Sequence, residues 1–61
     1  MSRLTPKEIR TKRGLPRRKV MALADVSEGS VRTYEADPDA VSPLVRAKLD
    51  PVYRDLARGL T

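Results

Sequence analysis

The sequence contains no cysteine and no histidine. Their absence excludes disulfide bonds, Cys/His zinc sites, thiol nucleophiles and acid–base catalysis by imidazole. We therefore expect that the protein is not an enzyme and that it holds no metal and no cofactor. Phenylalanine and tryptophan are also absent, so Tyr34 and Tyr53 are the only aromatic residues. A core assembled from Leu, Val, Ala and Ile suits a few packed helices.

Long apolar stretches are absent as well. A transmembrane helix needs about 20 mostly apolar residues, and the 61-residue chain has no such stretch. No signal-peptide pattern is present, so we expect a cytoplasmic protein associated with the nucleoid. The length allows a single domain over residues 1–61. A domain of this size buries roughly 60% of its unfolded surface and is only marginally stable alone.

Positive charge is concentrated at the start of the chain. The net charge is +5, and residues 1–20 carry +7, residues 21–41 carry −4 and residues 42–61 carry +2. The eight cations of this basic segment are Arg3, Lys7, Arg10, Lys12, Arg13, Arg17, Arg18 and Lys19. A solvated surface of mixed sign is one explanation. A polyanion docked on one face explains the uneven distribution better, and nucleic acid is the expected polyanion.

The first half of the chain predicts three short helices. Thr5, Pro6 and Glu8 form a complete helix start, with a capping residue, proline at the first helical position and a capping box. This helix should end at Gly14. A second helix should begin near Pro16 or Arg17, with Val20, Leu23 and Ala24 on one side, and break at Asp25. A third should follow the capping residue Ser27 and end near Ala36, with Val31 and Tyr34 pointing inward.

The second half predicts two more helices after a turn at Asp37-Pro38-Asp39. Ser42-Pro43 should open a fourth helix that carries Leu44, Val45 and Leu49. Asp50-Pro51 should open a fifth that carries Val52, Tyr53 and Leu56 and fades at Gly59. In both cases a capping residue precedes a proline at the first helical position. No window alternates as a strand does, so the predicted fold class is all-α.

Residues 17–36 carry the pattern most informative about function. Two helices that cross over a tight turn need apolar residues at certain points to share one core. Those points here are Val20, Ala24, Val26, Val31 and Tyr34. The pattern also includes Gly14-Leu15, Asp25, Ser27, Ser30 and Glu35. The spacing of these residues resembles that of the Cro/CI-type (phage-repressor-like) helix-turn-helix family. The resemblance implies a compact five-helix, lambda-repressor-like domain, with the helix-turn-helix at about 16–36.

The sequence departs from the family pattern at four places. Arg17 stands where the family usually has Gln, Met21 where it has Ala, and Asp25 where it has Gly. Ala36-Asp37-Pro38 replaces an Asn-Gly or similar pair. The string Ser30–Glu35 is also similar to MerR-type regulators, but those begin almost directly with the helix-turn-helix, and the helix expected at 5–13 argues against that assignment.

Several residues are candidates for contacts with DNA phosphates. Arg17, Arg18 and Lys19 fall in the first turn of the second helix, where cations oppose the helix dipole. A phosphate at the helix N-terminus gives a reason for placing them there, since free N–H groups and cations would converge on it. Ser27 and Ser30 are further phosphate candidates, although capping alone explains Ser27. A tolerated surface cluster of basic residues is the alternative.

The third helix, at about 28–36, is the expected recognition helix. Because Val31 and Tyr34 point inward, Glu28, Gly29, Arg32 and Thr33 should lie outside. The resemblance implies that these positions read base edges in the major groove. Arg32 suits guanine, Thr33 suits a thymine methyl and Glu28 suits the amino group of cytosine. Merely solvated side chains are the alternative.

Beyond DNA contacts, the resemblance implies an ion pair between Arg10 and Glu35, which fixes the recognition helix to its scaffold. Two unrelated surface charges are the alternative. The leading functional hypothesis is a sequence-specific double-stranded DNA-binding transcriptional regulator, by family default a repressor. It should bind a two-fold symmetric operator as a weak homodimer that associates through residues 51–61. The alternative is a protein-interaction module, antitoxin-like or adaptor, whose basic face meets an acidic protein partner.

Overall fold

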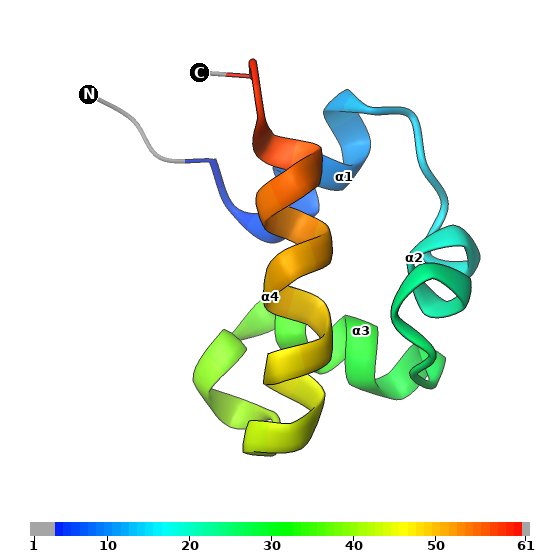
Figure 1. The fold of residues 1–61 in the computed structure, drawn as a ribbon, viewed down its shortest axis with the longest axis vertical. Helices are drawn as coiled ribbons and strands as arrows, with labels where there is room; N and C mark the ends of the chain where they lie inside the picture. The colour runs from blue at the N-terminus through cyan, green and yellow to red at the C-terminus, as the bar shows by residue number, and fades with distance from the viewer. Residues whose placement is uncertain (1–3, 61) are drawn as a thin grey trace.

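The computed structural model describes residues 4–60, so Arg3 of the basic segment lies outside the described part. Within this part the chain is all-α, as predicted, with four α-helices, one 3-10 helix and no strand. In chain order they are α1 (Pro6–Lys12), α2 (Arg17–Ala24), α3 (Glu28–Ala36), η1 (Pro38–Ala40) and α4 (Pro43–Ala57). The molecule measures 28 × 21 × 16 Å, and α4 runs along its longest axis with α1, α2 and α3 around it (Figure 1). None of the described helices has the length and apolar character that a membrane crossing requires.

The helix starts follow local capping chemistry. The Thr5 hydroxyl accepts a hydrogen bond from the Glu8 amide at 3.2 Å, and the Glu8 carboxylate accepts one from the Thr5 amide at 2.8 Å. This is the predicted capping box. Ser27 and Ser42 cap α3 and α4 with their hydroxyls, which accept hydrogen bonds from the amides of Ser30 and Val45. Each cap satisfies a backbone donor that the first turn of a helix leaves unpaired.

A tight turn separates α2 from α3. Asp25 adopts the left-handed conformation, with φ 57° and ψ 54°, and its amide donates to the carbonyl of Met21. Aspartate tolerates this region better than most residues, because its short polar side chain bonds locally. The chain then turns through Val26 and enters α3 after Ser27. The predicted break at Asp25 is thus confirmed.

The fourth and fifth predicted helices form one helix, so the prediction of five helices is wrong. Pro51 lies inside α4, which runs unbroken from Pro43 to Ala57. Proline removes one backbone donor from a helix interior. Core packing of residues before and after Pro51 nevertheless keeps α4 continuous. Leu49 and Tyr53 are four residues apart and therefore on one side of the helix, and both are buried, at 0% and 3% exposure. At Asp37-Pro38-Asp39, predicted as a turn, Asp37 caps η1 and the other two residues are the first two of this 3-10 helix.

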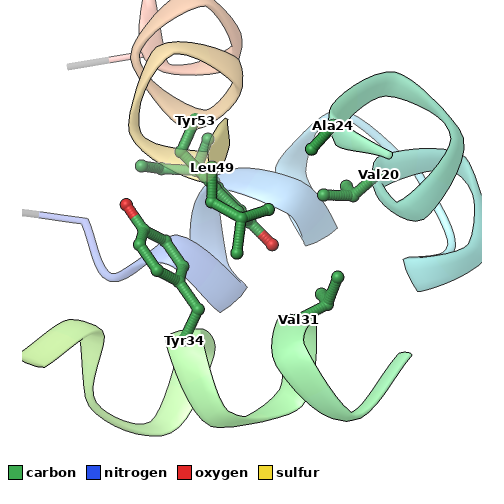
Figure 2. Close-up of a cluster of buried hydrophobic side chains, with 7 residues drawn as sticks. Val20, Ala24, Val31, Tyr34, Leu49 and Tyr53 are labelled. Atoms are coloured by element: carbon green, nitrogen blue, oxygen red, sulfur yellow. The ribbon is translucent and has the colours of Figure 1, made fainter. Parts of the chain in front are cut away.

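Seven buried residues from all four α-helices form the core. They are Ile9, Val20, Ala24, Val31, Tyr34, Leu49 and Tyr53. Figure 2 shows how the side chains of α2, α3 and α4 converge between the helices. The rings of Tyr34 and Tyr53 stack with their centroids 5.1 Å apart, so these two residues supply the aromatic packing of a core that is otherwise aliphatic.

Leu23 does not belong to this core, contrary to the prediction. Its side chain is 59% exposed. At about 100° per residue, the partly or fully buried residues Arg17, Val20, Met21 and Ala24 define one side of α2, and Leu23 lies well away from its centre. Leu44 at the start of α4 is also exposed, at 70%.

The continuity of α4 leads to a test at Pro51. Replacing Pro51 by alanine restores an amide that can donate to the carbonyl of Ala47, so Pro51→Ala should raise the free energy of unfolding. The expected gain is about 1–2 kcal/mol, because the greater freedom of alanine in the unfolded chain offsets part of the full proline penalty. Urea denaturation followed by circular dichroism measures it.

Pro43→Ala is the matched control for this test. Pro43 lies at the first position of α4, where the amide has no acceptor within the helix, so its replacement should give no gain. Equal effects of the two substitutions, or a loss of stability in Pro51→Ala, would contradict a continuous helix.

Candidate functional site

The outer side of α3 carries three of the four residues that the sequence predicts to read bases, and the fourth, Glu28, is exposed at the start of the helix. Gly29, Arg32 and Thr33 are exposed, whereas Val31 and Tyr34 are buried on the opposite side. A Cβ atom added at Gly29 would meet no atom within 4 Å, so packing within the domain does not require glycine at this position. The structure therefore places these three residues together on one open surface.

A shallow hollow adjoins this surface between α3 and the start of α4. Its volume is ≈ 430 Å³. The residues that line it are Ser27, Gly29, Ser30, Thr33, Ala40, Val41, Ser42 and Val45. Hydroxyl groups and small side chains thus surround an open depression beside the outer side of α3.

Ser27 and Ser30, predicted to contact phosphates, use their hydroxyls within the protein. The Ser27 hydroxyl accepts from the Ser30 amide at 3.3 Å and lies 3.1 Å from the Ser30 hydroxyl. Both groups can still accept or donate a further hydrogen bond. Capping is nevertheless a sufficient structural reason for Ser27.

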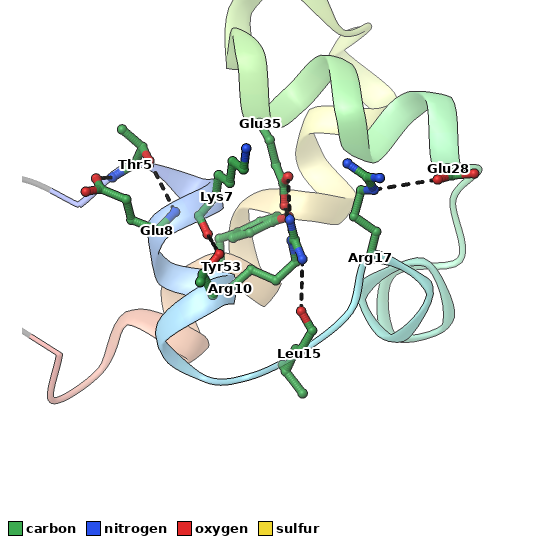
Figure 3. Close-up of polar contacts among 10 residues, drawn as sticks. Thr5, Lys7, Glu8, Arg10, Leu15, Arg17, Glu28, Glu35 and Tyr53 are labelled. Atoms are coloured by element: carbon green, nitrogen blue, oxygen red, sulfur yellow. Dashed lines mark hydrogen bonds and ion pairs between the residues drawn. The ribbon is translucent and has the colours of Figure 1, made fainter.

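The three cations at the start of α2 differ in their surroundings. Arg18 and Lys19 are exposed and form no ion pair with any other described residue. Arg17 instead pairs with Glu28 at the start of α3, with Nε 3.6 Å from Oε2 (Figure 3). The first turn of α2 contains no acidic residue, and Pro16 supplies no side-chain cap. Arg17 thus joins two helix starts, while Arg18 and Lys19 project into solvent.

Arg10 and Glu35 form a bidentate ion pair between α1 and α3. Arg10 Nε lies 2.5 Å from Glu35 Oε2, and its Nη2 lies 3.2 Å from Oε1. Their side chains are only 11% and 5% exposed. Nη1 of Arg10 also donates to the carbonyl of Leu15 at 2.9 Å, and the Tyr53 hydroxyl donates to Glu35 at 2.6 Å (Figure 3). The Glu35 carboxylate therefore links α3 to α1 and α4.

The ionisation of this cluster follows from its partners. Burial would raise the pKa of Glu35, but hydrogen bonds from Arg10 and Tyr53 outweigh it and lower the pKa below the ordinary 4.5. The hydrogen bond to Glu35 raises the pKa of Arg10. Burial and the nearby carboxylate raise the pKa of Tyr53, so its hydroxyl stays protonated and remains a donor.

Sequence reasoning missed the two tyrosine hydroxyls in this network. The Tyr34 hydroxyl donates to Asp50, and Tyr53 donates to Glu35. A usable signal was present in the composition, because a buried tyrosine needs a polar partner and Tyr34 and Tyr53 are the only aromatic residues. Which carboxylate each one meets depends on the packing of α4 against α3, which no local pattern specifies.

Arg13 has a structural role that the sequence also did not reveal. Its guanidinium donates to the carbonyl of Leu56 at 2.8 Å and to the carbonyl of Arg58. These carbonyls lie at the C-terminal end of α4, where the helix dipole favours a positive charge. Arg13 therefore joins the end of α1 to the end of α4.

Comparisons with known proteins add no assignment. No protein-family model matches the chain, and no curated protein or solved structure matches it either. The geometry of the described residues is therefore the basis for inferring function. Among them, no group of three or more acidic side chains is placed to hold a metal ion.

The buried ion pair predicts a large effect of Arg10→Ala on stability. The substitution leaves the Glu35 carboxylate buried without its main partner, so the free energy of unfolding should fall by about 3 kcal/mol or more. Thermal and urea denaturation measure the loss.

Arg46→Ala is the matched control for Arg10→Ala. Arg46 pairs with Asp39 and Asp50, but these side chains are 82% and 36% exposed and its own is 44% exposed. Surface pairs contribute little, so this variant should unfold close to the wild type. Equal midpoints for Arg10→Ala and Arg46→Ala would show that the Arg10–Glu35 pair does not hold the fold.

The lowered pKa of Glu35 predicts an acid-dependent contribution to stability. A carboxylate whose folded pKa is depressed stabilises the fold above its unfolded pKa and loses this contribution as the pH falls through the folded value. The difference in unfolding free energy between wild type and Glu35→Gln should therefore be largest near neutral pH and should narrow below 4.5. A difference that stays constant from about pH 7 to about pH 2.5 would contradict the prediction.

Proposed function

We propose that the protein is a sequence-specific double-stranded DNA-binding regulator, with α2 and α3 as a helix-turn-helix and α3 in the major groove. The observation that carries the proposal is the division of α3 into two sides. One side faces the protein interior through Val31, Tyr34 and Glu35. Arg32 and Thr33 project into solvent from the other side. The major groove, about 12 Å wide, admits an α-helix held in this way.

The side chains on the outer side suit base edges. Arg32 presents a planar guanidinium that can bond the O6 and N7 atoms of guanine, and the Thr33 methyl suits the methyl group of thymine. Gly29 leaves the backbone open to close approach, and no contact within the domain explains a glycine there. Arg18 and Lys19 at the start of α2 are free to bind phosphates on the flank of the groove.

The proposal includes repression and dimeric binding. The domain would repress by occupying a DNA site in the cytoplasmic nucleoid, and a two-fold symmetric site requires two copies. The expected association through residues 51–61 assumed an uncovered C-terminal helix. In the structure Tyr53 is buried, and Leu56 and Leu60 are partly buried against the core, so these three side chains expose less apolar surface than that expectation assumed. Among the described residues, the large apolar side chains that are exposed are Leu23 and Leu44.

A protein partner is the second candidate. The observation that favours it is the exposure of Leu23 and Leu44, at 59% and 70%, because apolar side chains on a basic domain can contribute to a protein interface. Electrophoretic mobility shifts with random and genomic duplexes at two salt concentrations separate this candidate from DNA binding.

The proposed contacts predict two opposite mutational signatures. Arg32→Ala should weaken binding to the preferred duplex by about 1–3 kcal/mol and relax selectivity at one or two base pairs, with little change in the salt dependence. Arg18→Ala should weaken all duplexes alike and reduce the slope of log K against log[salt] by about 0.9. Fluorescence anisotropy on preferred and scrambled duplexes over a salt series measures both quantities.

Lys19→Ala is the control for the phosphate contact and should behave as Arg18→Ala does. The opposite result, in which Arg18→Ala alone changes sequence preference and Arg32→Ala weakens every duplex equally, would place α2 rather than α3 in the groove. Absence of duplex binding by the wild type at low salt would overturn the proposed function.

A further inference from the structure

Met21 contributes the only sulfur atom within the described residues. The chain has no cysteine, and its other methionine, Met1, lies outside the described part. With no thiol in the chain, a thioether is the remaining sulfur group that peroxides can oxidise. The family pattern that the sequence resembles has alanine at this position, which offers no group to oxidise. Met21 is therefore a reactive residue of this chain that the proposed DNA contacts do not use.

Met21 lies on the side of α2 that faces the start of α3. It follows Arg17 by four residues and so shares its side of the helix, and Arg17 pairs with Glu28 of α3. Met21 is partly buried and packs against the core. This degree of burial leaves the residue accessible to a small oxidant, and it makes the chemical state of the side chain matter to the packing of α2.

The backbone of Met21 also holds the turn between α2 and α3. Its carbonyl oxygen accepts hydrogen bonds from two successive amides, those of Asp25 and Val26, the second at 3.2 Å. These two residues lead the chain out of α2 and towards α3. A displacement of Met21 would disturb both hydrogen bonds, so it would change how α3 is placed relative to α2.

Oxidation would replace an apolar contact by a polar group. The sulfur attacks one oxygen of a peroxide, the O–O bond breaks, and the sulfur loses two electrons as the S=O bond forms; with hydrogen peroxide the other product is water. A buried sulfoxide oxygen needs a hydrogen-bond donor. In the described part, every buried side-chain nitrogen and oxygen atom already has a partner, so none is waiting to bond a new oxygen. The oxidised side chain should therefore move from the core into water.

We propose that Met21 is a modification site at which peroxides switch off DNA binding by forming methionine sulfoxide. The inference rests on the proposed function, because binding requires Arg18 and Lys19 of α2 to reach phosphates while α3 occupies the groove. A change in the angle between the two helices separates these contacts. Methionine sulfoxide reductases reverse the modification, so the oxidised state is reversible.

Treatment of the full chain with hydrogen peroxide tests the site, with a duplex that the unoxidised protein selects from a randomised pool as the probe. Peptide mass spectrometry should locate one added oxygen at Met21. The unfolding temperature should fall, and the affinity for the selected duplex should drop by about fivefold or more. Methionine sulfoxide reductase with a thiol reductant should restore both. Met21→Gln, which places a polar amide there without oxidant, should weaken binding in the same direction.

Met21→Leu is the matched control, because leucine keeps the apolar volume and contains no sulfur. It should bind the selected duplex and keep its affinity and unfolding temperature in peroxide, although it retains Met1. Equal losses in the wild type and Met21→Leu, or a wild type that is oxidised at Met21 with unchanged affinity, would overturn the inference and leave the proposed function standing. If the unoxidised wild type selects no duplex, the proposed function fails and the inference fails with it.

Discussion

The orientation of α3 depends on one buried carboxylate. Glu35 accepts hydrogen bonds from Arg10 of α1 and Tyr53 of α4, so three of the four α-helices meet at its two oxygen atoms. Helices of seven, eight and nine residues, such as α1, α2 and α3, are unstable in isolation and form only where tertiary contacts hold them. A small core brings them together, and the directional bonds of Glu35 determine how α3 is rotated within it.

The network contributes specificity of arrangement more than net stability. Desolvation of a buried ion pair opposes much of its electrostatic gain, and well-packed apolar residues often stabilise a fold equally well. Apolar residues, however, would allow α3 to rotate or slide, because the hydrophobic effect has no preferred direction. Tyr34 of α3 and Tyr53 of α4 add the same kind of constraint, since each packs its ring in the core and directs its hydroxyl to one carboxylate of the other helix. The outer side of α3 is thereby held in one orientation.

The sequence predicted what depends on neighbouring residues and missed what depends on packing. The caps at Thr5, Ser27 and Ser42 and the turn at Asp25 were predicted because each involves bonds within a few residues. The division of α4 at Pro51 was wrong because burial of Leu49 and Tyr53 overrides the local signal of Asp50-Pro51. Leu23 was misplaced because a periodic pattern gives the apolar side of a helix only to within a residue or so. In the candidate site, the exposed positions on α3 followed from helical periodicity. The Arg17–Glu28 pair did not, because it depends on how α2 and α3 pack.

The number of cations in the basic segment overstates how many are free to bind a polyanion. Of the seven described cations in the basic segment, Arg10 and Arg17 are paired with carboxylates and Arg13 binds carbonyls at the end of α4. The other four, Lys7, Lys12, Arg18 and Lys19, are exposed. Few phosphate contacts limit the sequence-independent part of DNA affinity, which scales with the number of phosphates neutralised. In the proposed complex, a larger share of the affinity must then come from base contacts on α3 and from a second copy on the same duplex. A domain with fewer free cations is also released more readily from unrelated sequences, so engaging cations in structural contacts favours selectivity over affinity.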